Sequence, residues 1–162
     1  MEIERKFLVN EAPELGEHES VAIEQGYLAL ATDGGAEVRL RRKGGTHLLT
    51  IKGGTGEVRT EEELELERSR FDSLWPLTEG RRLMKTRYLI PQGELTIELD
   101  VYEGDLDGLV VAEVEFSGEA EADRFQPPPW FGPEVTGDER YLNESLATMG
   151  LPPGSPDPRS SF

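Results

Sequence analysis

Apolar and charged residues alternate with a period of two along most of this sequence. Such alternation is typical of β-strands, in which successive side chains point to opposite faces of a sheet. In the opening stretch MEIERKFLV, for example, Glu2, Glu4 and Lys6 would share one face. The same pattern predicts strands over residues 1–9, 22–30, 37–43, 47–52, 57–67, 84–90, 95–102 and 109–116.

Turn and helix signals separate these strands. Gly44 and Gly45 predict a β-hairpin, because glycine tolerates positive φ. Three segments favour short helices: residues 70–83, residues 119–126 with Ser117 as N-cap, and residues 139–149 with Asp138 as N-cap and Gly150 as the end. We expect one domain over residues 1–150 and a disordered tail over residues 151–162, which contain four prolines and little apolar content.

The number of strands predicts a mainly β (α+β) fold, either a barrel or a sandwich. Charges are segregated by strand, because residues 37–43 offer bases whereas residues 57–67 and 109–116 offer mostly acids. Solvated strand faces usually mix both signs, since like charges close together cost energy. The short helices also need an apolar partner, which outward strand faces of a closed barrel would supply. A barrel with a charged lumen is therefore an alternative to an ordinary sandwich with solvated charges.

Composition narrows the classes of function. The chain has 162 residues, which suits one domain with a sizeable core. Its 33 acidic residues against 17 Lys and Arg give a net charge of −16, which argues against general binding to nucleic acid or to an anionic membrane. No cysteine is present, which excludes disulfides and thiolate chemistry. Without an apolar leader or a stretch long enough to span a bilayer, we expect a cytoplasmic protein.

Charged groups that face a lumen need counter-ions, because an unpaired buried ion is costly. Carboxylates favour a hard divalent cation such as Mg²⁺ or Mn²⁺, which prefers oxygen ligands. Arg and Lys side chains favour an oxyanion, and the guanidinium fork of Arg matches two phosphate oxygens. A divalent cation together with several bases points to a polyphosphate ligand.

The sequence resembles the CYTH superfamily, also called triphosphate tunnel metalloenzymes. The resemblance begins with an ExExK signature formed by Glu2, Glu4 and Lys6. It continues, over nearly everything except the tail, through QGYL at 25–28, EVRLRRKGG at 37–45, LTIKGG at 49–54, RTEEELE at 59–65, KTRYLI at 85–90, ELDVYEG at 98–104, AEVEF at 112–116 and EVTGDERYLNESLA at 134–147. The resemblance implies a closed eight-stranded antiparallel β-barrel with a charged lumen and a few short helices packed outside.

The resemblance also implies roles for individual residues. Positions that match phosphate-binding residues are Lys6, Arg39, Arg41, Lys52, Lys85 and Arg87. Positions that match metal ligands are Glu2, Glu4, Asp100, Glu113 and Glu115. On the acidic strand, Glu61 could add a metal ligand and Glu63 could accept the proton of the attacking water, while Arg140 could reach a phosphate. Catalysis by positioning and neutralising the substrate would fall to Lys6, Arg39, Arg41 and Arg87.

Hydrolysis of inorganic triphosphate to pyrophosphate and orthophosphate is the leading hypothesis, with Mg²⁺ or Mn²⁺ as cofactor. The alternatives are an adenylyl cyclase acting on ATP, a thiamine triphosphatase and a polyphosphate-binding module without catalysis, because all would share the triphosphate-binding residues. The many carboxylates speak against binding alone. The expected partner is a small molecule that contains a triphosphate, and both a monomer and a homodimer stay open.

Overall fold

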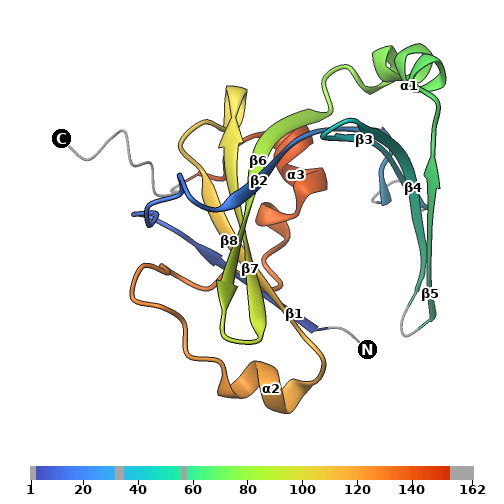
Figure 1. Ribbon diagram of the computed structural model, residues 1–162. Helices are drawn as coiled ribbons and strands as arrows, with labels where there is room; N and C mark the ends of the chain where they lie inside the picture. Colours follow the sequence, from blue (N-terminus) through green and yellow to red (C-terminus); the bar gives the residue numbers. More distant parts are fainter. Residues whose placement is uncertain (1–2, 32–34, 56–57, 154–162) are drawn as a thin grey trace.

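The computed structural model describes residues 3–31, 35–55 and 58–153. Eight strands form one antiparallel sheet: β1 (Ile3–Leu8), β2 (Glu19–Ala29), β3 (Glu37–Lys43), β4 (Thr46–Thr55), β5 (Val58–Glu65), β6 (Arg82–Gln92), β7 (Leu95–Glu103) and β8 (Val110–Phe116). Their order across the sheet is β1-β8-β7-β6-β2-β3-β4-β5, and every predicted strand is present with ends that differ by a few residues. The sheet curls so that β3, β4 and β5 lie opposite β1, β7 and β8 (Figure 1).

The two edges of the sheet are β1 and β5. Along the described residues no backbone pairing joins these two strands. The mainly β architecture with eight antiparallel strands is therefore confirmed, whereas closure into a barrel stays a prediction. Pairing of the first strand with the last places Glu4 directly opposite Glu115, which brings the two ends of the domain to one site.

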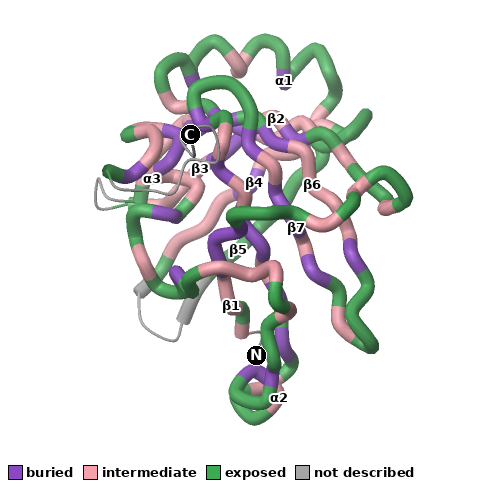
Figure 2. The backbone as a smooth tube through the Cα atoms, turned by 90° about the vertical axis from the view of Figure 1, so that its left-hand side faces the viewer, coloured by how far each residue is buried: buried purple, intermediate pink, exposed green. Residues whose placement is uncertain are grey.

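Short helices connect the strands and follow the last one: α1 (Arg68–Leu74), η2 (Trp75–Thr78), η3 (Gly104–Leu106), α2 (Glu119–Arg124), η4 (Glu139–Tyr141) and α3 (Asn143–Met149). The helix predicted over 70–83 is shorter than expected. It changes to 3₁₀ geometry at Trp75, because the following Pro76 has no N–H for an α-helical bond. Helix α1 exposes most of its residues (Figure 2), and Phe71 is its buried anchor.

Helix ends follow the predicted signals only in part. The single helix predicted over residues 139–149 is wrong, because the extended backbone of Leu142 divides it into η4 and α3. Asp138 caps η4 by accepting a backbone hydrogen bond at 3.1 Å, and Gly150 follows α3 with a φ of 78°. The predicted Ser117 cap of α2 is wrong, because Gly118 occupies the N-cap position. The Ser117 hydroxyl instead donates to Glu121 Oε2 at 2.6 Å, so a carboxylate in the first turn takes up the serine.

Apolar residues are buried on both faces of the sheet, in two separate clusters. On the outer face, Phe7, Leu99 and Phe116 pack with Phe125, which directly follows α2. On the inner face, apolar side chains gather toward one end of the strands: Leu8, Tyr27, Leu83, Tyr102 and Val111. Because side chains alternate along a strand, this inner cluster shares its face with charged residues such as Lys6.

Helix α3 covers the inner cluster. Leu146 and Ala147 of α3, with Tyr141 of η4, are buried in it. The expectation that the helices pack outside the barrel is therefore wrong for α3, although α2 does pack on the outer face. The physical reason is that the inner strand faces are charged along only part of their length, and their apolar end needs a cover.

The C-terminal segment continues this packing beyond α3. Leu151 packs against the inner cluster, and Pro152 is buried, so the packed core extends to these residues. Residues 154–162 of the predicted tail lie outside the described residues. None of the described helices is long and apolar enough to cross a membrane.

Candidate active site

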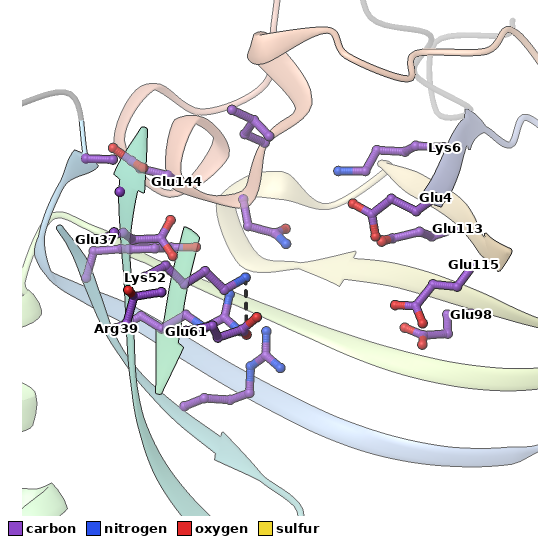
Figure 3. A pocket seen from close by; sticks show the side chains of 18 of the residues that line it. Glu4, Lys6, Glu37, Arg39, Lys52, Glu61, Glu98, Glu113, Glu115 and Glu144 are labelled. Atoms are coloured by element: carbon purple, nitrogen blue, oxygen red, sulfur yellow. Dashed lines mark ion pairs between the residues drawn. The ribbon is translucent and has the colours of Figure 1, made fainter. Parts of the chain in front are cut away.

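A cavity of about 840 Å³ opens on the concave side of the sheet (Figure 3). Its walls come from the inner faces of the curled strands and from residues 142–144 at the start of α3. Nine residues predicted for the site line it: Glu4, Lys6, Arg39, Arg41, Lys52, Glu61, Arg87, Glu113 and Glu115. The charged strand faces therefore converge on one cavity.

Three carboxylates gather at one side of this cavity: Glu4 from β1, and Glu113 and Glu115 from β8. One oxygen from each lies within 4.8 Å of the other two. A hydrogen bond with Glu113 raises the pKa of Glu4 to about 8, and burial and the negative charge of Glu113 act in the same direction. Without a cation, this three-carboxylate group therefore retains a proton at neutral pH.

Bases occupy the cavity wall that faces these carboxylates. Arg39 is only 9% exposed, and its buried Nε atom has no hydrogen-bond partner in the part of the chain that the structure describes. Burial, together with the positive charges of Arg39 and Arg87, lowers the pKa of Arg41 to about 10. Lys52 pairs with Glu61 at 3.7 Å, as the dashed line in Figure 3 marks. Clustered bases with an unsatisfied buried donor favour the binding of an anion.

Gln25, which the sequence analysis missed, holds one of these arginines. It is fully buried on β2, directly opposite Arg41 of β3. Its Oε1 atom accepts a hydrogen bond from Arg41 Nε at 2.9 Å, and its Nε2 atom donates to the Tyr27 hydroxyl at 2.7 Å. The presence of an amide side chain inside a predicted strand is the signal that could have pointed to Gln25. The contacts fix the orientation of the Arg41 guanidinium.

Lys85 and Asp100, predicted as phosphate and metal ligands, bind each other next to the cavity residue Arg87. Lys85 Nζ donates to Asp100 Oδ2 at 2.8 Å, with side-chain exposures of 0% and 4%. Arg87 donates to the same carboxylate from Nε at 2.8 Å and pairs with Glu98 at 2.8 Å. Burial would raise the pKa of Asp100, but the charges and hydrogen bonds of Lys85 and Arg87 lower it to about 2. Asp100 therefore positions Arg87, and the ligand roles of Lys85 and Asp100 stay predictions.

The other predicted residues have different surroundings. Glu63 is exposed on β5 and accepts a hydrogen bond from Thr50 Oγ1 at 3.3 Å. Arg140 is exposed and pairs with Asp138 at 2.6 Å, so its side chain is engaged outside the cavity lining. Glu2 lies outside the described residues. The roles assigned to these three site residues stay predictions.

Glu37, Asn143 and Glu144 also line the cavity, although none was predicted as a site residue. Glu37 lies two positions before Arg39 on β3, so the period-two pattern could have included it. Asn143 accepts a hydrogen bond from the Tyr102 hydroxyl at 2.6 Å, which holds the start of α3 to the inner face of the sheet. The strand pattern carries no information on this helix, and its two lining residues were missed for that reason.

Comparison with known proteins assigns the chain to a family. A family model described as CYTH domain matches residues 1–148. The chain belongs to the CYTH family. The inorganic triphosphatase of Nitrosomonas europaea is 50% identical over 148 residues, which cover 90% of this chain and 96% of that protein. The inorganic triphosphatase of Acetivibrio thermocellus is 37% identical over 147 residues, which cover 90% of this chain and 92% of that protein.

The fold of this CYTH chain is also similar to a solved structure. A crystal structure of an inorganic triphosphatase superimposes with a TM-score of 0.77 and 45% sequence identity. The match covers 94% of this chain and 97% of that one. Both comparisons confirm the resemblance seen in the sequence motifs.

The residues of this CYTH protein suit a divalent cation at the three-carboxylate group. Carboxylate oxygens that lie this close together are the hard ligands that Mg²⁺ and Mn²⁺ prefer. The raised pKa of Glu4 reflects the free-energy cost of holding three carboxylates together without a cation. The facing bases suit phosphate oxygens. The cavity therefore has suitable ligands for both a metal ion and a polyphosphate.

Proposed function

We propose that the protein hydrolyses inorganic triphosphate to pyrophosphate and orthophosphate, with a divalent cation as cofactor. The observation that carries this proposal is the meeting of three carboxylates and several bases in one cavity, where the buried Arg39 Nε has no partner among the residues described. Relatives at 50% and 37% identity are inorganic triphosphatases, which supports the same substrate for this chain.

The bases of the cavity would bind and align the substrate. Arg39, Arg41 and Arg87 would hold the phosphate chain, because a guanidinium group can donate two parallel hydrogen bonds to phosphate oxygens. Lys6 and Lys52 would add positive charge from β1 and β4. Phosphoryl transfer proceeds through a loose transition state, so the protein contributes mainly positioning and neutralisation. These side chains would stabilise the negative charge that builds on the leaving pyrophosphate.

Glu4, Glu113 and Glu115 would hold the cation, either Mg²⁺ or Mn²⁺. When bound, this ion would act as a Lewis acid that neutralises phosphate oxygens. Further proposed ligands are Glu2, Glu61 and Asp100. The carboxylate of Glu63 remains the proposed acceptor for the proton of the attacking water.

Closure of the curled sheet into a tunnel belongs to the same proposal. Bases on β3 and β4 face carboxylates on β1 and β8 across the cavity (Figure 3). A substrate and cation bound to both walls would bridge them. The bridge would favour a smaller separation between the two sheet edges, because opposite charges attract more strongly at short distance.

The test is a product-release assay on protein with a C-terminal tag, since a tag beside Glu2 and Glu4 would disturb the acidic wall. Tripolyphosphate, ATP and thiamine triphosphate are supplied separately with Mg²⁺ or Mn²⁺, and orthophosphate, pyrophosphate and cyclic AMP are measured. We expect the highest kcat/KM for release of orthophosphate from tripolyphosphate. Arg39→Gln should lower it roughly a hundredfold, because one preorganised donor is lost.

Matched variants control for charge and folding. Arg68→Gln removes a charge from an arginine that is 81% exposed on α1 and should leave kcat/KM unchanged. Cyclic AMP and pyrophosphate from ATP, in place of orthophosphate from tripolyphosphate, would make the protein a cyclase. Binding of tripolyphosphate without release of orthophosphate would make it a binding module.

A further inference from the structure

A second pair of carboxylates lines the cavity, and the proposed function gives it no role. Glu37 of β3 and Glu144 of α3 lie on the wall opposite the three-carboxylate group (Figure 3). Arg39 and Lys52 lie on the same wall. An acidic pair among the bases that would bind a phosphate chain is unfavourable for an extended anion, so it requires an explanation.

The contacts of the pair tie it closely to the basic wall. Glu37 is opposite Lys52 in the pairing of β3 with β4, and it precedes Arg39 by two positions on the same face. Burial raises the pKa of Glu37. The positive charges of Arg39 and Lys52 lower this pKa, whereas the charge of Glu144 and a hydrogen bond with its carboxyl group raise it. The Oε1 atom of Glu144 is buried, and no described residue forms a hydrogen bond with it. The two carboxyl groups are therefore neighbours on the cavity wall, and each residue is partly exposed.

Arg39 shows where an anion is expected beside this pair. The residue is more than nine-tenths buried, and its Nε donor has no acceptor among the described residues. A buried guanidinium donor without an acceptor is costly, so an anion bound at Arg39 would be stabilised. Under the proposed function that anion is a phosphate of the substrate, and it would have Glu37 and Glu144 on one side.

Volume alone does not restrict the length of the substrate. The cavity measures about 840 Å³, in the upper part of the range of about 300–1,000 Å³ found for sites that hold drug-sized ligands. A phosphate chain longer than three units would fit in such a space. Selection against it has to come from charge.

We propose that Glu37 and Glu144 form a negatively charged stop, so that the phosphate held by Arg39 is the last of its chain. The site would then select linear triphosphate against inorganic polyphosphates of four or more units. A further phosphate beyond Arg39 would meet the negative charge of this acidic pair, and placing like charges side by side is costly. This inference rests on the proposed function and specifies its substrate class.

The same carboxylates could instead accept hydrogen bonds from the hydroxyls of a ribose, which would favour a nucleotide. The described cavity lining argues against this use, because Tyr27 is its single aromatic ring. That ring is 1% exposed, and its hydroxyl is bonded to Gln25. A nucleobase would therefore find no exposed ring among the described lining residues on which to stack.

The test compares chain lengths within each protein. We would measure kcat/KM for tripolyphosphate and for tetrapolyphosphate in the wild type, in Glu144→Gln and in the double variant Glu37→Gln/Glu144→Gln. Glutamine keeps the shape of glutamate and removes its charge. The ratio of the two constants is independent of the fraction of folded protein, so partial unfolding of a variant does not obscure the result. Controls are Glu139→Gln and Glu94→Gln/Glu139→Gln, which remove the same charge from exposed residues.

We expect the wild type to prefer tripolyphosphate. The kcat/KM for tetrapolyphosphate, divided by that for tripolyphosphate, should rise roughly tenfold in Glu144→Gln and further in the double variant. The controls should keep the wild-type ratio. An unchanged ratio in the double variant, with tripolyphosphate still hydrolysed, would overturn the stop and leave the proposed function intact. If the variants lose ATP turnover selectively while the ratio of kcat/KM values stays unchanged, the stop would likewise be overturned in favour of a ribose contact. Failure of the wild type to hydrolyse tripolyphosphate would overturn both proposals.

Discussion

The Lys85 ammonium group donates a hydrogen bond to the Asp100 carboxylate at 2.8 Å, and both side chains are buried. Arg87 binds the same carboxylate through Nε at 2.8 Å and through Nη2 at 3.0 Å. One carboxylate thus binds two bases on β6, and one of these bases lines the cavity. Stability and site geometry therefore depend on the same group.

Asp100→Asn should lower the free energy of unfolding by about 3–5 kcal/mol, because it leaves buried Lys85 without a charged partner. Urea unfolding followed by circular dichroism measures this change. Asp105→Asn is the matched control, since Asp105 is exposed, and its effect should stay within about 0.5 kcal/mol. Equal effects of the two substitutions would mean that the buried pair contributes no more than a surface charge.

Alternation located every strand, because successive side chains of a strand take opposite faces of the sheet and here charged and apolar residues are separated onto those faces. It also predicted which charged residues share a face, as Arg39 and Arg41 on β3 and Glu113 and Glu115 on β8 line one cavity. These features depend on local sequence alone. The same holds for Gly150, whose φ of 78° ends α3 as predicted.

Features that depend on long-range packing were not predictable in this way. Tyr102 lies two positions after Asp100 on the inner face, and Leu8 lies two positions after Lys6, so apolar residues do appear in phase with the charges. Alternation alone does not tell what covers them, and α3 was expected outside. The shared carboxylate of Asp100 likewise depends on the register of β7 with β6, which places Arg87 opposite it.

Gln25 is expected to act as a positioning residue for Arg41. Gln25→Met removes the acceptor of Arg41 Nε while keeping a similar volume, so kcat/KM for tripolyphosphate should fall about tenfold. Arg41→Lys should cause a loss that Gln25→Met does not increase, because lysine has no Nε atom for the amide to hold. Additive losses in the double variant would contradict this positioning role. Gln92→Met, at an exposed end of β6, is the control.

Gly26 is required by the close approach of η2 to β2. A Cβ atom at this position would lie 2.6 Å from both Cβ and Oγ1 of Thr78. Thr78 is fully buried, and its hydroxyl donates to the Trp75 carbonyl at 2.7 Å, so it has little room to move. Gly26→Ala should therefore destabilise the fold by about 1–3 kcal/mol in thermal or urea unfolding. Gly16→Ala, with no atom within 4 Å of the added Cβ, should be close to neutral, and equal stability of the two variants would refute the steric argument.

Binding of a divalent cation should release protons in a way that depends on pH. The pKa of Glu4 is raised from 4.5 to about 8, so most of this group is protonated at pH 7 in the metal-free protein. A cation favours the ionised carboxylate, and binding of Mg²⁺ or Mn²⁺ should therefore expel up to about one proton at pH 7 and almost none at pH 9.5, where Glu4 has already ionised. Calorimetric titration in two buffers of different ionisation enthalpy measures the number of protons released. Glu4→Gln should abolish the release while Glu94→Gln keeps it, and a release that is the same at both pH values would show that Glu4 does not supply the proton.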